Sequence, residues 1–201
     1  MPRTPKPKQP KCVYQLKVTL RNIRPPIWRR LLVTSDTKLS RLHDILQAAM
    51  GWWGGHLHQF TARGVYYGDL QFVEDLGWGP KVHDEHRFTL ADVARGEKAK
   101  LLYEYDFGDG WEHDIVVEKV LPVEKGVRYP ICIKGRRACP PEDVGGPWGY
   151  GEFLEALRDP NHPEHETYSD WIEGSFDPEA FDLDSVNKQL KTSHLRPSLP
   201  L

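Results

Sequence analysis

The sequence predicts an α+β protein in which a mostly antiparallel sheet carries helices packed on one face. Apolar and polar residues alternate in segment 14–20, whereas apolar residues recur at spacings of three and four in segment 39–53. An Asp-Gly pair at 109–110 stands between two further alternating runs, which is typical of a hairpin. Two strands, one helix, more strands and then several helices favour α+β over a parallel α/β fold. The same order is similar to a β-grasp core followed by C-terminal helices.

Length and composition indicate one folded domain. The chain has 201 residues, of which 39% are apolar and 11% aromatic, and this is enough to build a hydrophobic core. We expect a single α+β domain over residues 13–192 and a short tail over residues 193–201. Residues 1–12 alternate proline with basic residues, and we expect a disordered arm there.

Charge and cysteine content exclude several classes of protein. A formal net charge of -2 argues against a surface built throughout to grip nucleic acid, although the basic arm allows weak, non-specific contact with it. Three cysteines do not suit the disulfide framework of a secreted protein and favour a reducing cytosol. No run approaches the ~20 apolar residues of a membrane span, and the N-terminus lacks the apolar run of a signal peptide. We therefore expect a cytoplasmic protein with no membrane partner.

The first half of the chain contains segments with the two-residue alternation of strands and segments with the three-and-four spacing of helices. Segment 14–20 predicts a half-buried strand, and Pro25 and Pro26 break the chain before a second strand over 27–33. A helix over 39–53 follows three candidate capping residues at 35–37, and Gly51, Gly54 and Gly55 are expected to end it. Segment 56–68 predicts two strands that turn at Gly64, and Thr89 with Asp92 forms a capping-box pattern before a short helix.

The second half of the chain predicts the hairpin and then helices. The hairpin spans residues 101–120, and segment 129–151 is rich in glycine and proline, which predicts a loop. Helices are expected at 152–159 and within 163–174 and 177–190.

Two registers of the hairpin compete. A two-residue turn at 109–110 would set Phe107 opposite Glu112 and mix apolar with acidic residues on both faces. A three-residue turn at 108–110 sets Phe107 opposite Trp111 and Tyr105 opposite His113, so that one face becomes apolar and aromatic. We favour this second register. It pairs Asp106 with Glu112 and Glu104 with Asp114 on the outer face, and each like-charge pair costs roughly 0.2 to 1 kcal/mol.

We expect the repulsion between these paired carboxylates to be compensated. Water, an arginine from elsewhere in the fold, and a bound divalent cation are the three alternatives. The candidate arginines belong to the motifs WRR and GRR, and they are Arg29, Arg30, Arg136 and Arg137.

Histidines and cysteines supply candidate metal ligands. His56 and His58 would share one side of a strand, since side chains two residues apart point to the same face. Cys132 and Cys139 are further apart than the two to four residues typical of zinc knuckles. Together with carboxylates of the hairpin, the candidate set for a divalent metal is His56, His58, Asp106, Glu112, Cys132 and Cys139.

Long motifs in a fixed order carry a family resemblance. They include RPPIWRRLLV, LSRLHDILQAAMGW, LLYEYDFGDGWEHDIVVE and YPICIKGRRACPPEDVGG, and the likeness runs from about Tyr14 to Leu190. The chain resembles the plasmid pRiA4b ORF-3-like family, whose members are often labelled passenger proteins of insertion elements. The resemblance implies a prokaryotic α+β domain and no particular chemistry. Relatives commonly carry a cysteine where this chain has Val144, whereas Cys132, Cys139, Glu142 and Asp143 match the family pattern.

Three functions fit the sequence. The first is a non-enzymatic interaction module that recognises a protein partner through an acidic and aromatic hairpin surface. The second is a hydrolase or nuclease that uses a divalent metal held by the hairpin carboxylates and nearby histidines. The third is an adaptor for DNA transactions that uses the basic arm and the arginines of WRR and GRR. The residues expected on the hairpin surface are Asp106, Asp109, Trp111, Glu112, His113 and Asp114.

Overall fold

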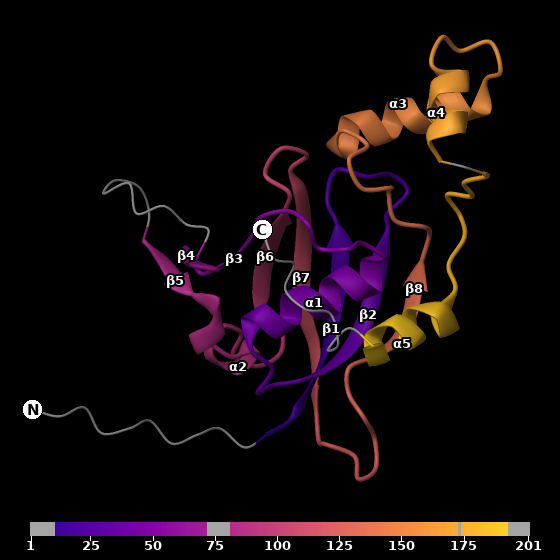
Figure 1. The fold of residues 1–201 in the computed structure, drawn as a ribbon. Helices are drawn as coiled ribbons and strands as arrows, with labels where there is room; N and C mark the ends of the chain where they lie inside the picture. Colours follow the sequence, from indigo (N-terminus) through magenta and orange to yellow (C-terminus); the bar gives the residue numbers. More distant parts are fainter. Residues whose placement is uncertain (1–10, 72–80, 173, 193–201) are drawn as a thin grey trace, which may run out of the picture.

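The fold is built on one eight-stranded sheet, seen in a computed structural model that describes residues 11–71, 81–172 and 174–192. The strands lie in the order β5-β4-β3-β6-β7-β1-β2-β8, and every neighbouring pair is antiparallel except the parallel pair β4-β5 (Figure 1). The strands are β1 (Val13–Leu20), β2 (Trp28–Thr34), β3 (His58–Ala62), β4 (Val65–Gly68), β5 (Val82–Asp84), β6 (Lys100–Tyr105), β7 (Trp111–Leu121) and β8 (Ile131–Arg136).

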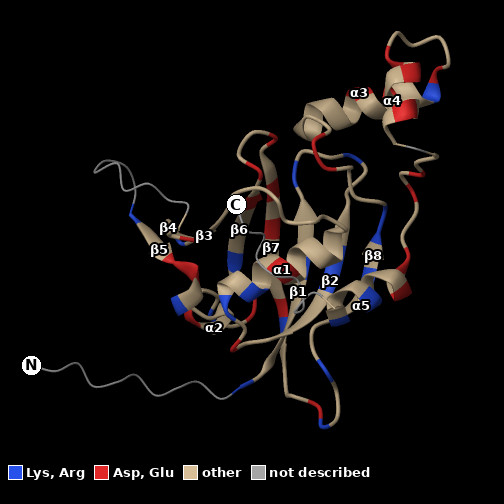
Figure 2. Ribbon diagram, in the orientation of Figure 1, with Lys and Arg blue, Asp and Glu red and all other residues tan. Residues whose placement is uncertain are grey.

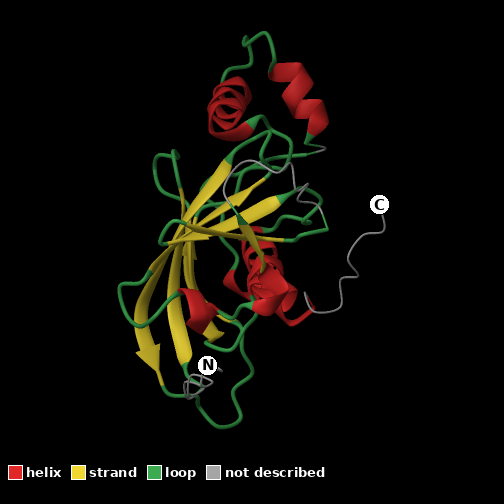
Figure 3. Ribbon diagram, turned by 90° about the vertical axis from the view of Figure 1, so that its left-hand side faces the viewer, coloured by secondary structure: helices red, strands yellow, loops and turns green. Residues whose placement is uncertain are grey.

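The helices pack on one face of this sheet and beyond one of its ends. Helices α1 and α5 lie side by side against the sheet, whereas α3 and α4 project past the end of the strands (Figures 1 and 3). The α+β prediction is confirmed, but the β-grasp likeness is not. The helices are α1 (Leu39–Met50), the 3₁₀ turn η1 (Glu85–Arg87), α2 (Leu90–Val93), α3 (Gly146–Arg158), α4 (His165–Trp171) and α5 (Leu183–Thr192).

Helix α1 covers the middle of the sheet with an apolar stripe. Leu39, Leu42, Leu46 and Ala49 are buried at the spacings of three and four that predicted the helix. Gly51 ends it three residues before the predicted limit, because its left-handed backbone (φ 92°) closes the last turn. The predicted capping box of α2 is confirmed, with Thr89 and Asp92 bonded reciprocally.

The segment predicted as a loop over 129–151 contains two regular elements. Residues 131–136 form β8, an edge strand that pairs with β2, and α3 begins at Gly146. The short strand was not predicted because glycine and charged residues interrupt its apolar pattern. The start of the helix was not predicted because Gly145, Gly146 and Pro147 are residue types common in loops. No helix among the described residues is long and apolar enough to cross a membrane.

The hairpin of β6 and β7 has neither predicted register. Tyr105 lies opposite Trp111, Tyr103 opposite His113 and Glu104 opposite Glu112, so the turn holds five residues, 106–110. The favoured register is therefore wrong by two residues, a shift that keeps each side chain on its predicted face. One face is apolar and aromatic as expected. The outer face has one like-charge pair, Glu104 with Glu112, in place of the two predicted pairs.

Candidate functional site

Three loops meet at the end of the sheet where the hairpin turns. They are the loop after α1 (51–57), the turn between β6 and β7 (106–110) and the loop after β8 (137–145). The backbone N–H of Asp106 donates to the carbonyl of Leu57 (2.8 Å), and the N–H of Gly145 donates to a side-chain oxygen of Asp109 (3.2 Å). These bonds join segments that are far apart in sequence into one surface.

Asp106 shapes the turn with one oxygen of its side chain. Its backbone is left-handed (φ 55°), and Oδ1 accepts hydrogen bonds from the N–H groups of Gly108 (3.0 Å) and Asp109 (3.3 Å). The motif DFGDG thus forms a turn held by an aspartate, which lengthens the loop beyond the predicted three residues. The other oxygen, Oδ2, points toward His56 at 3.6 Å.

His56 lies between two aspartates from different loops. Its Nδ1 is 3.6 Å from Asp106 Oδ2, and its Nε2 is 3.1 Å from Asp143 Oδ1. The rings of Trp53 and Tyr105 hold the imidazole edge-on, each at a centroid distance of 5.7 Å. One ligand atom from each of His56, Asp106 and Asp143 can be chosen so that all three lie within 4.8 Å of one another. This geometry suits a divalent cation or a hydrogen-bonding ligand.

Glu142 stands beside this cluster with both carboxylate oxygens engaged. The hydroxyl of Tyr105 donates to Oε1, and the backbone N–H of Trp53 donates to Oε2 (2.9 Å). Burial raises the pKa of Glu142 above its usual range, and the hydrogen bond from Tyr105 opposes that shift. Burial, reinforced by the neighbouring Glu142, also raises the pKa of Tyr105, so its hydroxyl stays protonated and donates. Glu142, in the loop after β8, therefore links this loop to the loop after α1 and to the end of β6.

Large apolar side chains from two of these loops and from the start of α3 are exposed. Trp53 is 54% exposed, Phe107 50% and Trp148 92%, and Leu57 joins them as an exposed apolar side chain. Trp53 and Leu57 come from the first loop, Phe107 from the turn, and Trp148 from the first turn of α3. We call this set, with Asp106, Glu142 and Asp143, the loop-end surface.

The strands of the hairpin do not present the predicted aromatic surface. Trp111 and His113 are buried, with 1% and 0% exposure, and pack against Trp52 and Tyr103 in the core. Burial lowers the pKa of His113 to about 4, so its imidazole is neutral at physiological pH. These two residues belong to the core because they alternate with the acidic residues that face outward.

Two acidic residues of the outer face, Glu112 and Asp114, are paired with an arginine that sequence reasoning missed. Arg21 Nη1 lies 3.1 Å from Glu112 and Nη2 lies 2.7 Å from Asp114, and these bonds raise the pKa of the guanidinium. Figure 2 shows the acidic colour on β7 next to the hairpin turn. The arginine alternative is thus confirmed in kind, but not in the residue that provides it.

Three of the four arginines predicted for this role, Arg29, Arg30 and Arg137, have other partners. Arg29 is buried and donates to the carbonyls of Ala49 (2.9 Å) and Arg136 (3.0 Å). Arg30 pairs with Glu118 at 2.6 Å and lowers the pKa of that carboxyl to about 2. Arg137 donates to the carbonyl of Pro25 (2.7 Å) and lies 2.7 Å from Glu179.

The predicted metal set separates into distinct places. His58 begins β3, bonds to Glu85 (3.0 Å) and stacks on His43, whereas His56 lies in the preceding loop. The prediction that both histidines share one strand face is therefore wrong. Glu112 is held by Arg21.

The cysteines lie apart from the histidine cluster, and Cys139 accepts a hydrogen bond from Nη2 of the buried Arg29 (3.2 Å). Cys132 bonds weakly to the carbonyl of Lys134 (3.5 Å), and Cys139 lies 3.5 Å from the sulfur of Met50. Burial raises the pKa of the Cys139 thiol to about 11, which disfavours the thiolate that a metal needs. Of the predicted set, only His56 and Asp106 converge.

Asp143 is the ligand candidate that the sequence alone did not single out. The available signal was its place in the motif CPPED, which the family resemblance had already marked. Val144, which follows it, is buried in the core and is not one of the three converging residues.

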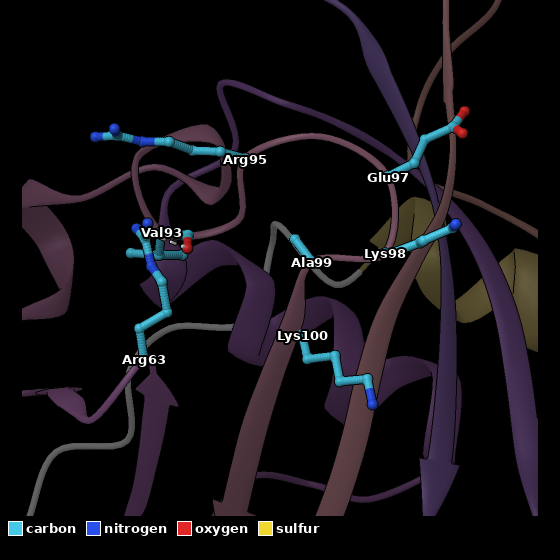
Figure 4. A pocket seen from close by; sticks show the side chains of 7 residues that line it. All are labelled: Arg63, Val93, Arg95, Glu97, Lys98, Ala99 and Lys100. Carbon is cyan, nitrogen blue, oxygen red and sulfur yellow. Dashed lines mark hydrogen bonds between the residues drawn. The ribbon is translucent and has the colours of Figure 1, made fainter.

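A separate hollow lies at the opposite end of the same hairpin (Figure 4). Its volume is about 310 Å³, and four of its lining side chains are cationic. Arg63 donates to the carbonyl of Val93 (3.3 Å), while Glu97 accepts from the backbone of Val120 (3.1 Å). Lys100 starts β6 and the hairpin turn follows its end, so the hollow is distinct from the loop-end surface. Its lining residues are Arg63, Val93, Arg95, Glu97, Lys98, Ala99 and Lys100.

Comparisons with known proteins agree with this fold. Residues 12–185 match the family described as plasmid pRiA4b ORF-3-like protein. An uncharacterized protein of Sinorhizobium fredii is 44% identical over 178 residues, which cover 88% of this chain and 89% of that protein. The crystal structure of a protein of unknown function from Methanosarcina mazei Go1 is similar with a TM-score of 0.76 and 39% identity, covering 87% of this chain and 97% of the other.

Proposed function

The chain belongs to the plasmid pRiA4b ORF-3-like family, and we propose that it is a non-enzymatic interaction module that binds a basic segment of a protein partner. The observation that carries this proposal is the exposure of Trp53, Phe107 and Trp148, which belong to, or directly follow, the loops that carry the carboxylates of the loop-end surface. Large aromatic side chains exposed together are typical of interaction sites, because their burial in a complex is strongly favourable. Tryptophan in particular is enriched among the residues that dominate binding energy.

The carboxylates of this surface favour a cationic partner. Asp143 has 59% of its side chain exposed and lies beside the ring of His56, and that ring packs edge-on against Trp53. Lysine and arginine side chains interact with both carboxylates and tryptophan faces, the latter by about 0.5 to 1 kcal/mol when exposed. By contrast, Glu112 and Asp114 are already paired with Arg21. The partner is therefore expected to contact the turn and its neighbouring loops, not the hairpin strands.

The supporting layer beneath the surface favours a preformed site. Trp52 is buried and donates from its indole N–H to the carbonyl of Pro140 (2.9 Å), and it stacks on Tyr105 at 5.3 Å. Tyr105 in turn bonds to Glu142, which receives the N–H of Trp53. A surface held by such contacts loses little conformational entropy on binding.

The two alternative functions have less support. A hydrolase built on the hairpin carboxylates could use Asp106, Asp109, Glu112 or Asp114 as metal ligands, but Arg21 already pairs with Glu112 and Asp114. A DNA adaptor needs free arginines, yet Arg29 and Arg137 are buried and bond to carbonyls. Most of the basic arm lies outside the described residues, and Lys11 at its end pairs with Asp36 (3.0 Å). Both functions remain predictions from the sequence.

Selection from a random peptide library tests the proposal. We expect the full chain to enrich peptides with lysine or arginine beside an apolar residue, and their binding to weaken at high salt. Trp148→Ala should weaken binding by roughly 2 kcal/mol, about 30-fold, as expected for a tryptophan that becomes buried in a complex.

The matched control is Trp171→Ala, because Trp171 is also an exposed tryptophan but packs edge-on against Phe153 on α3, away from the three loops. It should bind the selected peptides as the wild type does. Enrichment of acidic or neutral peptides, or equal binding by Trp148→Ala, would overturn the proposal. Self-association of the chain through this surface would also contradict the proposal. Sedimentation of the wild type and of both variants detects it.

A further inference from the structure

We propose that His56, Asp106 and Asp143 bind a divalent transition-metal ion that joins the three loops of the loop-end surface. The inference rests on the convergence of these residues and not on the interaction proposed above. Each comes from a different loop, and one imidazole and two carboxylates are a common set of metal ligands.

The distances match a site that needs a small closure. Ligand atoms on one ion with bonds of about 2.1 Å lie at most about 4.2 Å apart. One candidate atom from each residue falls within 4.8 Å of the others, and His56 Nε2 is already 3.1 Å from Asp143 Oδ1. Because the two aspartates lie beside different nitrogens of the ring, small rotations of the side chains of His56 (29% exposed) and Asp143 (59% exposed) close the remaining gap. The closure therefore needs no movement of the sheet.

Two atoms of the cluster, Asp106 Oδ2 and His56 Nε2, are available to bind an ion. Asp106 uses Oδ1 for the backbone of its own turn, which fixes the carboxylate and leaves Oδ2 3.6 Å from Nδ1 of the His56 ring. Within the described residues, His56 Nε2 is buried and makes no hydrogen bond of acceptable geometry, despite its closeness to Asp143. A buried nitrogen without a hydrogen bond is costly in a folded protein. A metal ion at Nε2 would remove that cost and the repulsion between the two aspartates.

The ligand types select the class of ion. Mg²⁺ and Ca²⁺ prefer sites made wholly of oxygen, whereas imidazole favours later first-row metals. With three protein ligands, the ion keeps at least one position for water or for a partner's side chain. We expect affinity to rise from Mn²⁺ through Co²⁺ toward Zn²⁺, in the usual order for nitrogen and oxygen donors.

Calorimetric titration of the full chain with ZnCl₂, CoCl₂, MnCl₂ and MgCl₂ tests the site. Zn²⁺ and Co²⁺ should bind at about one ion per chain, and bound Co²⁺ should show the visible absorption of a site with nitrogen and oxygen ligands. Mg²⁺ should bind at least tenfold more weakly than Zn²⁺. Asp143→Asn and His56→Gln should each weaken Zn²⁺ binding by about tenfold or more.

The matched control is His86→Gln. His86 also lies beside an aspartate, Asp69 at 3.5 Å, but these two do not form part of a three-ligand cluster in the described part of the chain. Its loss should leave Zn²⁺ binding unchanged. No binding by the wild type, or equal binding by Asp143→Asn and His56→Gln, would overturn the proposal, and circular dichroism confirms that each variant is folded. Trp148→Ala should retain Zn²⁺ binding, which separates this inference from the interaction surface.

Discussion

Replacing His113 by phenylalanine should remove a loss of stability that the wild-type protein shows as pH falls. His113 is fully buried between Trp52 and Tyr103, with ring centroids 5.4 and 5.3 Å away. Its Nδ1 lies 3.3 Å from the carbonyl of Tyr103 and 3.2 Å from that of Trp111, so Nδ1–H is the donor in the neutral ring. Nε2 is buried without a hydrogen bond within the described residues, and protonation there would place a charge in the core.

The size of the effect follows from the shift in pKa. Burial lowers the pKa of His113 from 6.5 to about 4. Below the unfolded value the unfolded chain binds the proton first, so stability falls as pH drops from 6.5 and levels off below the folded value. A shift of about 2.5 units at 1.36 kcal/mol per unit gives about 3 kcal/mol, lost between neutral pH and about pH 4.

Urea unfolding followed by tryptophan fluorescence measures this loss at a series of pH values. Carboxylates that titrate in the same range affect both proteins alike, so the difference between wild type and His113→Phe isolates the histidine. His43 stays in both proteins and cancels too, although burial and the neighbouring His58 also lower its pKa. His113→Gln is a second variant without a titrating ring, in case phenylalanine overfills the site. Equal losses in wild type and both variants would refute the reasoning.

Two further predictions concern the hairpin and its contact with α3. Arg21→Gln removes the cation that bridges Glu112 and Asp114; because all three side chains are partly exposed, urea unfolding should show a loss of only about 0.5 to 1 kcal/mol, smaller at high salt. Gly146→Ala should cost about 3 kcal/mol or more in the same assay, since the new Cβ would lie 2.2 Å from a backbone oxygen of the turn at a residue whose φ is 69°. Its control, Gly151→Ala in the same helix, has open space and should stabilise by about 0.5 to 1 kcal/mol; similar effects at both glycines would contradict the close contact.

Local periodicity predicted most of the regular elements, because it reports which face of a segment is buried. The alternation in 14–20 and 27–33 corresponds to β1 and β2, and the three-and-four spacing to α1. The hairpin register was missed for a local reason as well. The side chain of Asp106 accepts two backbone N–H groups and its backbone is left-handed, so β6 ends two residues earlier than the apolar pattern suggests.

The charge partners depend on contacts that the sequence does not encode locally. Arg21 is separated from Glu112 and Asp114 by 91 and 93 residues, and only the pairing of β1 with β7 brings them together. Arginines in conspicuous pairs drew attention, whereas Arg21 stands alone beside a turn. Similarly, His56 and Asp106 were selected by residue type, but Asp143 needed the fold to place its loop beside theirs.

The motifs that identify the family also build the loop-end surface. DFGDG supplies Asp106, Phe107 and Asp109, while PPEDVGG supplies Glu142, Asp143 and the glycines that approach the turn. A Cβ at Gly146 would collide with the turn, so these two motifs fit together as one contact rather than as separate features. Residues needed only for the fold could be replaced by many apolar alternatives, but exposed Trp148 and Asp143 stabilise the fold little. Their presence at the junction of the two motifs is therefore better explained by a ligand, and the peptide and metal titrations determine which kind it is.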